Sequence, residues 1–170
     1  MTHRNPDTHA SPPDMETPGA AIARLIAGLK PRQRLLGLDV GSTTIGLAIS
    51  DFSQAIATPL ETIARTKLTK DIEALRKIVK EREVGALVIG LPVSMHGTDG
   101  TRCQSTRQFA LNIEPLGLPC GFWDERLSTA AVTRLMIDAD MTRKRRGELV
   151  DKMAAAYILQ GALDAARLAR

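Results

Sequence analysis

The sequence predicts an α/β domain in which a mixed five-stranded sheet carries helices on both faces. Short apolar runs typical of strands alternate with segments of helical period. The first two runs follow each other across a glycine-containing turn, which favours an antiparallel hairpin, whereas the later runs are separated by helices, which favours parallel pairing. The chain has 170 residues, of which 44% are hydrophobic, so it has the size of one domain with its own core.

The N-terminal part predicts a tail and a short helix. Residues 1–18, "MTHRNPDTHASPPDMETP", are polar and punctuated by proline, so we expect them to be disordered. Thr17-Pro18 is typical of a helix entry, and apolar residues recur at helical spacing over Gly19–Leu29. We therefore expect a single domain over residues 19–170 that begins with a helical extension.

The first half of this domain predicts four strands and one helix. Pro59 marks the third strand as an edge strand, because proline has no N–H to donate to a neighbour. The fourth run, Ala86–Gly90, is continuously apolar, as is typical of a strand buried on both faces. The other expected elements are strands over Leu35–Val40, Thr44–Ser50 and Ala55–Ile63, and a helix over Thr69–Arg82.

The second half predicts one further strand among three helices. A polar loop, "LPVSMHGTDG", follows the fourth strand, and Trp123 is interpreted as a core residue of the fifth. The expected elements are a helix over Thr101–Ile113, a strand over Pro119–Trp123, a helix from a cap at Ser128 or Thr129 to Ile137, and a last helix over Gly147–Leu168.

Three carboxylates are candidate site residues. Asp39 interrupts an apolar run in "LGLDVGSTTIGLAISD", where an unpaired buried charge costs several kcal/mol unless it forms a turn or binds something. Glu125 comes just past the last strand, and functional groups gather at the carboxyl ends of parallel strands. Asp151 shares a helix face with Ala155 and Ile158, which turns it inward if that face is packed. The alternative for Asp151 is a role at the helix start.

Three inward carboxylates would repel one another. At ~4 Å and an effective dielectric constant near 20, each pair costs on the order of 4 kcal/mol. A divalent cation removes this cost, and carboxylates without histidine or cysteine favour Mg²⁺ or Mn²⁺. Such ions activate water and stabilise the leaving oxygen of a phosphodiester. The sequence therefore predicts a metal-dependent nuclease with Asp39, Glu125 and Asp151 as its catalytic and metal-binding residues.

The charge distribution predicts a nucleic-acid partner that is held by its phosphates. The formal net charge is +4 and the densest basic run spans residues 143–146. Aromatic residues make up 3% of the chain, which is too few for a base-stacking platform. Arg126 either contacts phosphate or pairs with a neighbouring acid. The candidate nucleic-acid contacts are Arg126, Arg143, Lys144, Arg145, Arg146 and Lys152.

Four segments carry a resemblance to a known family. "LLGLDVGSTTIGLAISD", "VIGLPVSMHGTDG", "WDERLSTAAV" and "ELVDKMAAAYILQGAL" occur in order over about residues 34–165 and resemble the YqgF family of pre-16S rRNA nucleases and Holliday-junction-resolvase-like proteins. The resemblance implies a ribonuclease H-like fold and an acidic site at Asp39, Glu125 and Asp151. It also implies metal-dependent maturation of a small-subunit ribosomal RNA precursor in ribosome biogenesis.

Two positions depart from the family pattern. The family commonly carries arginine where this chain has Thr44, so one cation near the site is lost. Its central loop commonly reads Asn-Met-Asp-Gly where residues 94–97 read Ser-Met-His-Gly, so His96 replaces an acid. An isolated loop histidine is more often solvated than a metal ligand or proton donor. Neither departure removes one of the three carboxylates.

Three other functions stay open from the sequence. A non-catalytic RNA-binding ribosome-assembly factor would keep the fold and the basic surface, and a Holliday-junction-type resolvase would cut branched DNA. "DVGSTT" also resembles the phosphate loop of actin-like nucleotide-binding proteins, which need a second half that this chain is too short to supply.

Localisation and cysteine chemistry complete the expectations. No run approaches the ~18 apolar residues of a membrane span, and the N-terminus lacks the layout of a secretion signal, so we expect a soluble, cytoplasmic protein. Cys103 and Cys120 lack metal-ligand spacing and are expected to be reduced thiols without a role.

Overall fold

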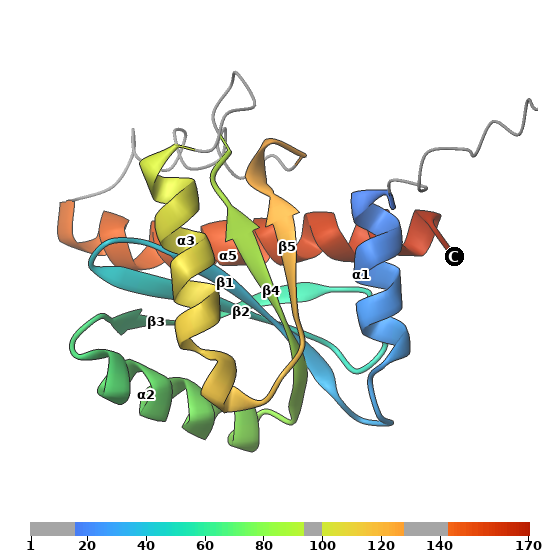
Figure 1. Cartoon of the computed structure of the whole chain (residues 1–170), viewed down its shortest axis with the longest axis horizontal. Helices are drawn as coiled ribbons and strands as arrows, with labels where there is room; N and C mark the ends of the chain where they lie inside the picture. The colour runs from blue at the N-terminus through green and yellow to red at the C-terminus, as the bar shows by residue number, and fades with distance from the viewer. Residues whose placement is uncertain (1–15, 94–99, 128–142) are drawn as a thin grey trace, which may run out of the picture.

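A mixed sheet of five strands, ordered β3-β2-β1-β4-β5, forms the centre of the computed structural model (Figure 1). The structure describes residues 16–93, 100–127 and 143–170, with the side chains of 143–151 left out. β1 pairs antiparallel with β2, and β2 with β3, whereas β1, β4 and β5 are parallel, which confirms the expected mixed sheet. The strands are β1 (Arg34–Val40), β2 (Thr44–Ser50), β3 (Ala57–Ala64), β4 (Val84–Leu91) and β5 (Cys120–Asp124).

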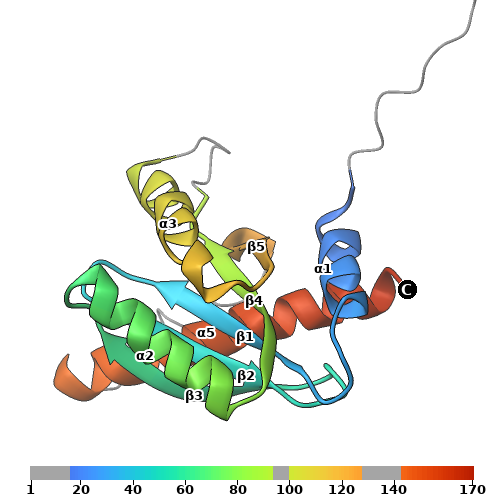
Figure 2. The same cartoon turned by 60° about the horizontal axis from the view of Figure 1, so that its bottom comes forward.

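Helices cover both faces of the sheet, as the sequence predicts. α5 crosses one face, whereas α2 and α3 lie on the other (Figures 1 and 2). The described α-helices are α1 (Pro18–Ala27), α2 (Leu68–Glu81), α3 (Thr101–Asn112) and α5 (Arg143–Leu168), with 3-10 turns at Glu114–Leu116 and Glu125–Leu127.

The central strands separate two apolar cores. Side chains alternate between the faces of a strand. Leu35 therefore packs with the α5 core, whereas its neighbour Leu36 packs with the α2 and α3 core. All of β4 is buried, as expected for its continuous apolar run. Each fully buried leucine or isoleucine contributes roughly 1.5–3 kcal/mol, so these two layers fix the sheet between its helices.

α1 is the expected helical extension. The Thr17 side chain accepts a hydrogen bond from the backbone N–H of Ala20, and the helix ends at Ala27, two residues before the expected Leu29, with Gly28 as its cap. Ile22 is fully buried in the core beside α5. α1 packs on α5 and on β5, and Figure 2 shows it beside the C-terminal part of α5.

β3 is the edge strand that Pro59 predicts. It lies at one end of the sheet and pairs with β2 only. The pairing register shifts between Leu47 and Ala48, and Ala48 faces Pro59 across the ladder. A proline without an N–H is tolerated at such an irregularity because the outer side of the strand has no partner in the sheet.

The last helix begins earlier than the sequence predicts. α5 starts at Arg143 instead of Gly147, so the basic run of residues 143–146 forms its first turn. A single glycine costs about 1 kcal/mol in a helix, whereas each added residue gains a hydrogen bond, so Gly147 does not end the helix. Cations at a helix start oppose the helix dipole, so a bound anion there would be favourable.

Several expectations fall outside the described residues. These are most of the N-terminal tail, the loop residue His96, and the helix expected from Ser128 or Thr129 to Ile137. Among the helices that the structure does describe, none combines the length and apolar character needed to cross a membrane.

Candidate active site

Asp39 lies near the carboxyl end of β1, the central strand, and is only 5% exposed. A Cβ placed on Gly37, two residues earlier, would meet the carbonyl oxygen of Ala155 and the Cβ of Leu159 in α5. Because side chains two residues apart share a face, the Asp39 carboxylate lies on the α5 side of the sheet.

Two glycines flank Asp39 on this face. Gly46 of β2 is its partner in the antiparallel ladder. On the other side, the parallel register pairs Leu38 with Ile89, so Gly90 of β4 lies beside Asp39 one step further along. Directly paired residues share a face, and glycine carries no side chain. The Asp39 carboxylate is therefore flanked in both neighbouring strands by a residue without a side chain.

Glu125 approaches the same place from β5. It opens the 3-10 turn after the strand and is half-buried. A Cβ placed on Gly90 would lie 3.0 Å from Glu125 Oε1 and 2.4 Å from Ile158 Cδ1, so the carboxylate occupies the space that this glycine leaves. Gly90 thus has Asp39 on one side and the Glu125 carboxylate over it. Both predicted residues therefore border Gly90 on the α5 face.

Asp151 lies in α5, the helix that covers this face, but its side chain is outside the described residues. Ala155, one turn later, is fully buried, and its carbonyl would be 3.2 Å from a Cβ at Gly37. Ile158 is fully buried over Gly90. The expectation that Ala155 and Ile158 mark the packed face is confirmed, and two glycines let the α5 backbone approach the sheet closely.

Arg126 pairs with a neighbouring acid, one of the two roles expected for it. Its guanidinium donates through Nη2 to Asp124 Oδ2 at 2.7 Å, and its backbone N–H donates to Asp124 Oδ1 at 2.9 Å. Burial acts to raise the pKa of Asp124, but the hydrogen bonds from Arg126 and its charge outweigh burial, so the pKa lies below its usual value. At neutral pH this ion pair fixes the turn that carries Glu125.

Trp123 is a core residue, as expected, and does not form an exposed stacking platform. Its side chain is 3% exposed and belongs to the core beside α5. The indole Nε1 finds no hydrogen-bond partner within the described part of the chain. Burying that donor costs free energy, which the large apolar area of the ring offsets.

The donor set at Asp39 and Glu125 fits a hard divalent cation. Both residues offer carboxylate oxygens, and oxygen ligands are those that Mg²⁺ and Mn²⁺ prefer. The described side chains contain no group of three histidines, cysteines or acids placed to hold a metal. The side chain of Asp151, the third residue that the sequence predicts, lies outside the described residues.

The turn after Asp39 is held by a residue that sequence reasoning did not single out. Arg65, at the end of β3, donates from Nη1 to the carbonyl of Gly41 at 2.7 Å. Its backbone N–H donates to the carbonyl of Thr43 at 2.8 Å, and the turn closes with a bond from the Gly41 N–H to the Thr44 carbonyl. No local pattern could have signalled this contact, because it joins residues far apart in the chain.

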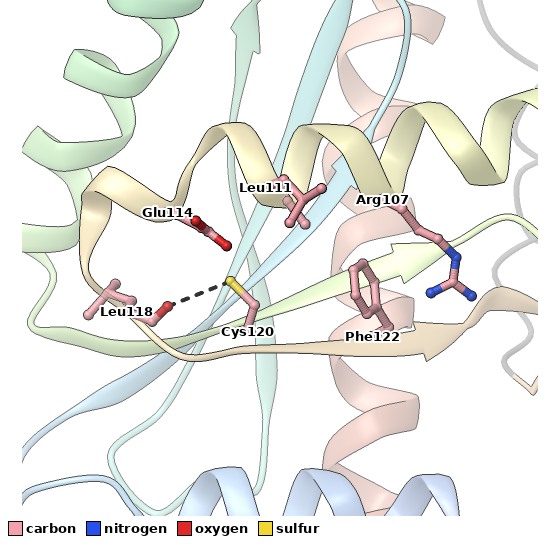
Figure 3. Close-up of a pocket in the computed structure, with 7 residues that line it drawn as sticks. Arg107, Leu111, Glu114, Leu118, Cys120 and Phe122 are labelled. Carbon is pink, nitrogen blue, oxygen red and sulfur yellow. Dashed lines mark hydrogen bonds between the residues drawn. The ribbon is translucent and has the colours of Figure 1, made fainter.

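A separate pocket of about 410 Å³ lies between α3 and β5 (Figure 3). Leu111, Leu118 and Phe122 give it a largely apolar lining, and Arg107 stacks over the Phe122 ring at 5.4 Å. Cys120 donates from Sγ to the carbonyl of Leu118 at 3.7 Å. Burial and then the nearby Glu114 charge raise the pKa of this thiol, which makes it a poor nucleophile. We assign this pocket no part in the acidic site.

Comparisons with known proteins identify the family of the chain. A family model described as "RuvX: Holliday junction resolvase" matches residues 33–165. The chain is 61% identical to a protein of Paramagnetospirillum magneticum and 55% identical to one of Methylocella silvestris, both named "Putative pre-16S rRNA nuclease". Each alignment covers 86% of this chain, and they cover 96% and 91% of the two relatives respectively.

Among solved structures, the fold is similar to that of T. thermophilus RuvC in complex with a Holliday junction substrate. The TM-score is 0.51 at 15% sequence identity, over 80% of this chain and 96% of that chain. This likeness supports the fold alone. The expected ribonuclease H-like architecture is confirmed by it together with the observed strand order.

Proposed function

Since the chain belongs to the RuvX family of Holliday junction resolvase-like proteins, we propose that it hydrolyses phosphodiester bonds in the precursor of 16S ribosomal RNA with Mg²⁺ or Mn²⁺. The observation that carries this proposal is that Asp39 and the Glu125 carboxylate both border Gly90 on the α5 face of the sheet. The RNA substrate is favoured by the names of the curated relatives, which cover nearly the whole domain.

The acids have distinct tasks in this proposal. Asp39, on the rigid central strand, would anchor the cation, Glu125 would hold it from the β5 side, and Asp151 would complete the ligand set from α5. A bound divalent ion supplies activation of the attacking water and charge stabilisation at the leaving oxygen. Asp124 orients the turn of Glu125 through Arg126, so the ligand set is positioned before substrate binds.

Cations are proposed to hold the substrate strand. The run of residues 143–146 forms the first turn of α5. The helix dipole repels these cations, and a bound phosphate would offset that repulsion. Lys152 follows on the same helix and is half-buried, and Arg126 lies next to Glu125. These contacts address the backbone and not the bases, so sequence selectivity is expected to be low.

A cleavage assay tests the proposed function. The purified protein is expected to cut a precursor fragment that spans one end of 16S rRNA in Mg²⁺ or Mn²⁺, and to leave it intact in EDTA. A four-way DNA junction of equal length is the competing substrate. Cleavage of the junction alone would replace the proposal with a DNA resolvase. RNA binding without cleavage in any divalent ion would replace it with an assembly factor.

Gly90→Ala is expected to lower cleavage more than stability. The added Cβ would lie 2.4 Å from Ile158 Cδ1, so Ile158 must shift, and 3.0 Å from Glu125 Oε1, so Glu125 must give by a few tenths of an ångström; the cost is about 1–3 kcal/mol. Displacing Glu125 misplaces a proposed metal ligand, and the metal-dependent cleavage rate should fall at least about tenfold. Gly100→Ala, where a Cβ meets no atom of the described residues within 4 Å, is the matched control. Wild-type cleavage by Gly90→Ala would remove Glu125 from the site.

A further inference from the structure

A polar pocket of about 610 Å³ lies between the β1–β2 turn and α3. Val40 also lines it and directly follows Asp39, but Val40 packs with the α2 and α3 core. The pocket therefore begins one residue after Asp39 at the carboxyl end of β1, on the opposite face of the sheet. Its polar lining residues are Ser42, Thr43, Thr44, Arg102, Ser105 and Thr106.

The lining chemistry fits an anion with several oxygens. The described lining carries five hydroxyl groups and the guanidinium of Arg102, and no carboxylate. Hydroxyl groups donate single hydrogen bonds, whereas guanidinium donates two in the parallel geometry that phosphate oxygens accept. Thr106 is 2% exposed at the pocket wall, and its hydroxyl donates to the carbonyl of Arg102 at 2.9 Å, which ties together the α3 side of the pocket.

The turn side of the pocket is fixed in advance. Arg65 donates to the carbonyls of Gly41 and Thr43, and the Arg65 guanidinium lies over the Phe109 ring at 5.3 Å. These contacts fix the position of the turn, because two of its carbonyl oxygens accept hydrogen bonds from Arg65. A ligand in the pocket would then meet hydroxyl groups already in place, and less conformational entropy would be lost on binding.

We propose that this pocket holds the phosphate of a nucleotide that flanks the bond to be cut. The inference rests on the proposed function and extends it to a second contact with the same strand. A nucleic-acid strand carries one phosphate per nucleotide, so a strand that crosses the carboxyl end of β1 can bring one phosphate to Asp39 and a neighbouring one to the pocket. The pocket thereby sets the position of the strand without reading its bases.

Binding measurements in EDTA test this pocket without any cleavage. The probes are a 12-nucleotide single-stranded RNA of mixed sequence and the matching DNA, followed by fluorescence anisotropy over a series of salt concentrations. Arg102→Gln is expected to weaken binding about tenfold at low salt. It should also lower the slope of log affinity against log salt by about 0.7, the value for one phosphate contact on a single strand. RNA and DNA should respond alike.

Two further variants separate charge from hydroxyl contacts. Arg102→Lys should keep the wild-type salt slope but recover only part of the affinity, because an ammonium group lacks the planar pair of donors. The double variant Thr43→Val, Ser105→Ala should weaken binding severalfold without changing the slope, since neutral donors release no counterion.

Arg107→Gln is the matched control. Arg107 lies on the same helix and carries the same charge, but it stacks on Phe122 in the separate pocket of Figure 3. Its salt slope should equal that of the wild type. The proposal would be overturned if Arg102→Gln had the same salt slope as the wild type, or if both arginine variants lost the same affinity. It would also be overturned if the Arg102 effect appeared with RNA alone, or if the wild type bound neither strand. An inactive enzyme that keeps the Arg102 effect would refute only the proposed function.

Discussion

Asp39→Asn is expected to abolish metal-dependent cleavage, by about a thousandfold or more, while affinity for RNA in EDTA stays equal or rises. The amide keeps the shape of the side chain but removes the charge that would anchor a divalent cation, whose contribution to such reactions is several kcal/mol. Affinity does not fall, because a negative charge near the phosphate is lost. The measurements are the cleavage rate of the precursor fragment and its binding without metal.

Thermal unfolding gives the same variant a second readout. Mn²⁺ should raise the melting temperature of the wild type, because a ligand that binds the folded state stabilises it, and Asp39→Asn should lose this rise. Asp164→Asn is the control, since Asp164 pairs with Arg167 at 3.2 Å near the far end of α5. Cleavage by Asp39→Asn at the wild-type rate, or an unchanged response to Mn²⁺, would remove Asp39 from the metal site.

Gly37→Ala is expected to cost about 1–3 kcal/mol of the free energy of unfolding. Its Cβ would lie 2.8 Å from Leu159 Cβ and 3.2 Å from the Ala155 carbonyl oxygen. Neither atom is the end of a flexible side chain, so the α5 helix must shift as a whole. At roughly 2–4 °C per kcal/mol, the melting temperature should fall by about 2–12 °C. Cleavage should fall with it, because α5 carries Asp151.

Gly28→Ala provides the contrast. Gly28 has a φ of −80° and a Cβ there would meet its nearest atom at 3.5 Å, an ordinary contact. Alanine restricts the unfolded chain, so this variant should be neutral or gain about 0.4–1 kcal/mol. If both glycine variants unfold at the wild-type temperature, then α5 does not need a side-chain-free position on β1, and its close approach to the sheet is not a constraint on the site.

Local patterns predicted most of the fold. The glycine-containing turn predicted the β1–β2 hairpin, and Pro59 predicted the edge strand. The helical period predicted the ends of α2 and α3 to within one residue. The predicted start of α5 was wrong by four residues, because the helix includes Gly147 and the basic run before it. Boundaries of this kind depend on small differences in free energy that nearby residues alone do not reveal.

The site, too, could be predicted from the sequence only in part. That Asp39 is unusual follows from one carboxylate in an apolar strand. That Arg102 of α3 lines the same pocket as Thr44 could not be predicted from either segment, and neither could the support that Arg65 gives the turn.

The sequence by itself determined the elements, their order, and which acids stand where a strand ends, because periodicity and turn chemistry act over a few residues. Only the tertiary structure decided that Gly46 and Gly90 border Asp39, that Glu125 fills the space over Gly90, and that α5 sits close enough to cover both. The physical reason is that register and close approach are set by packing between segments distant in the chain, and no single segment carries that information.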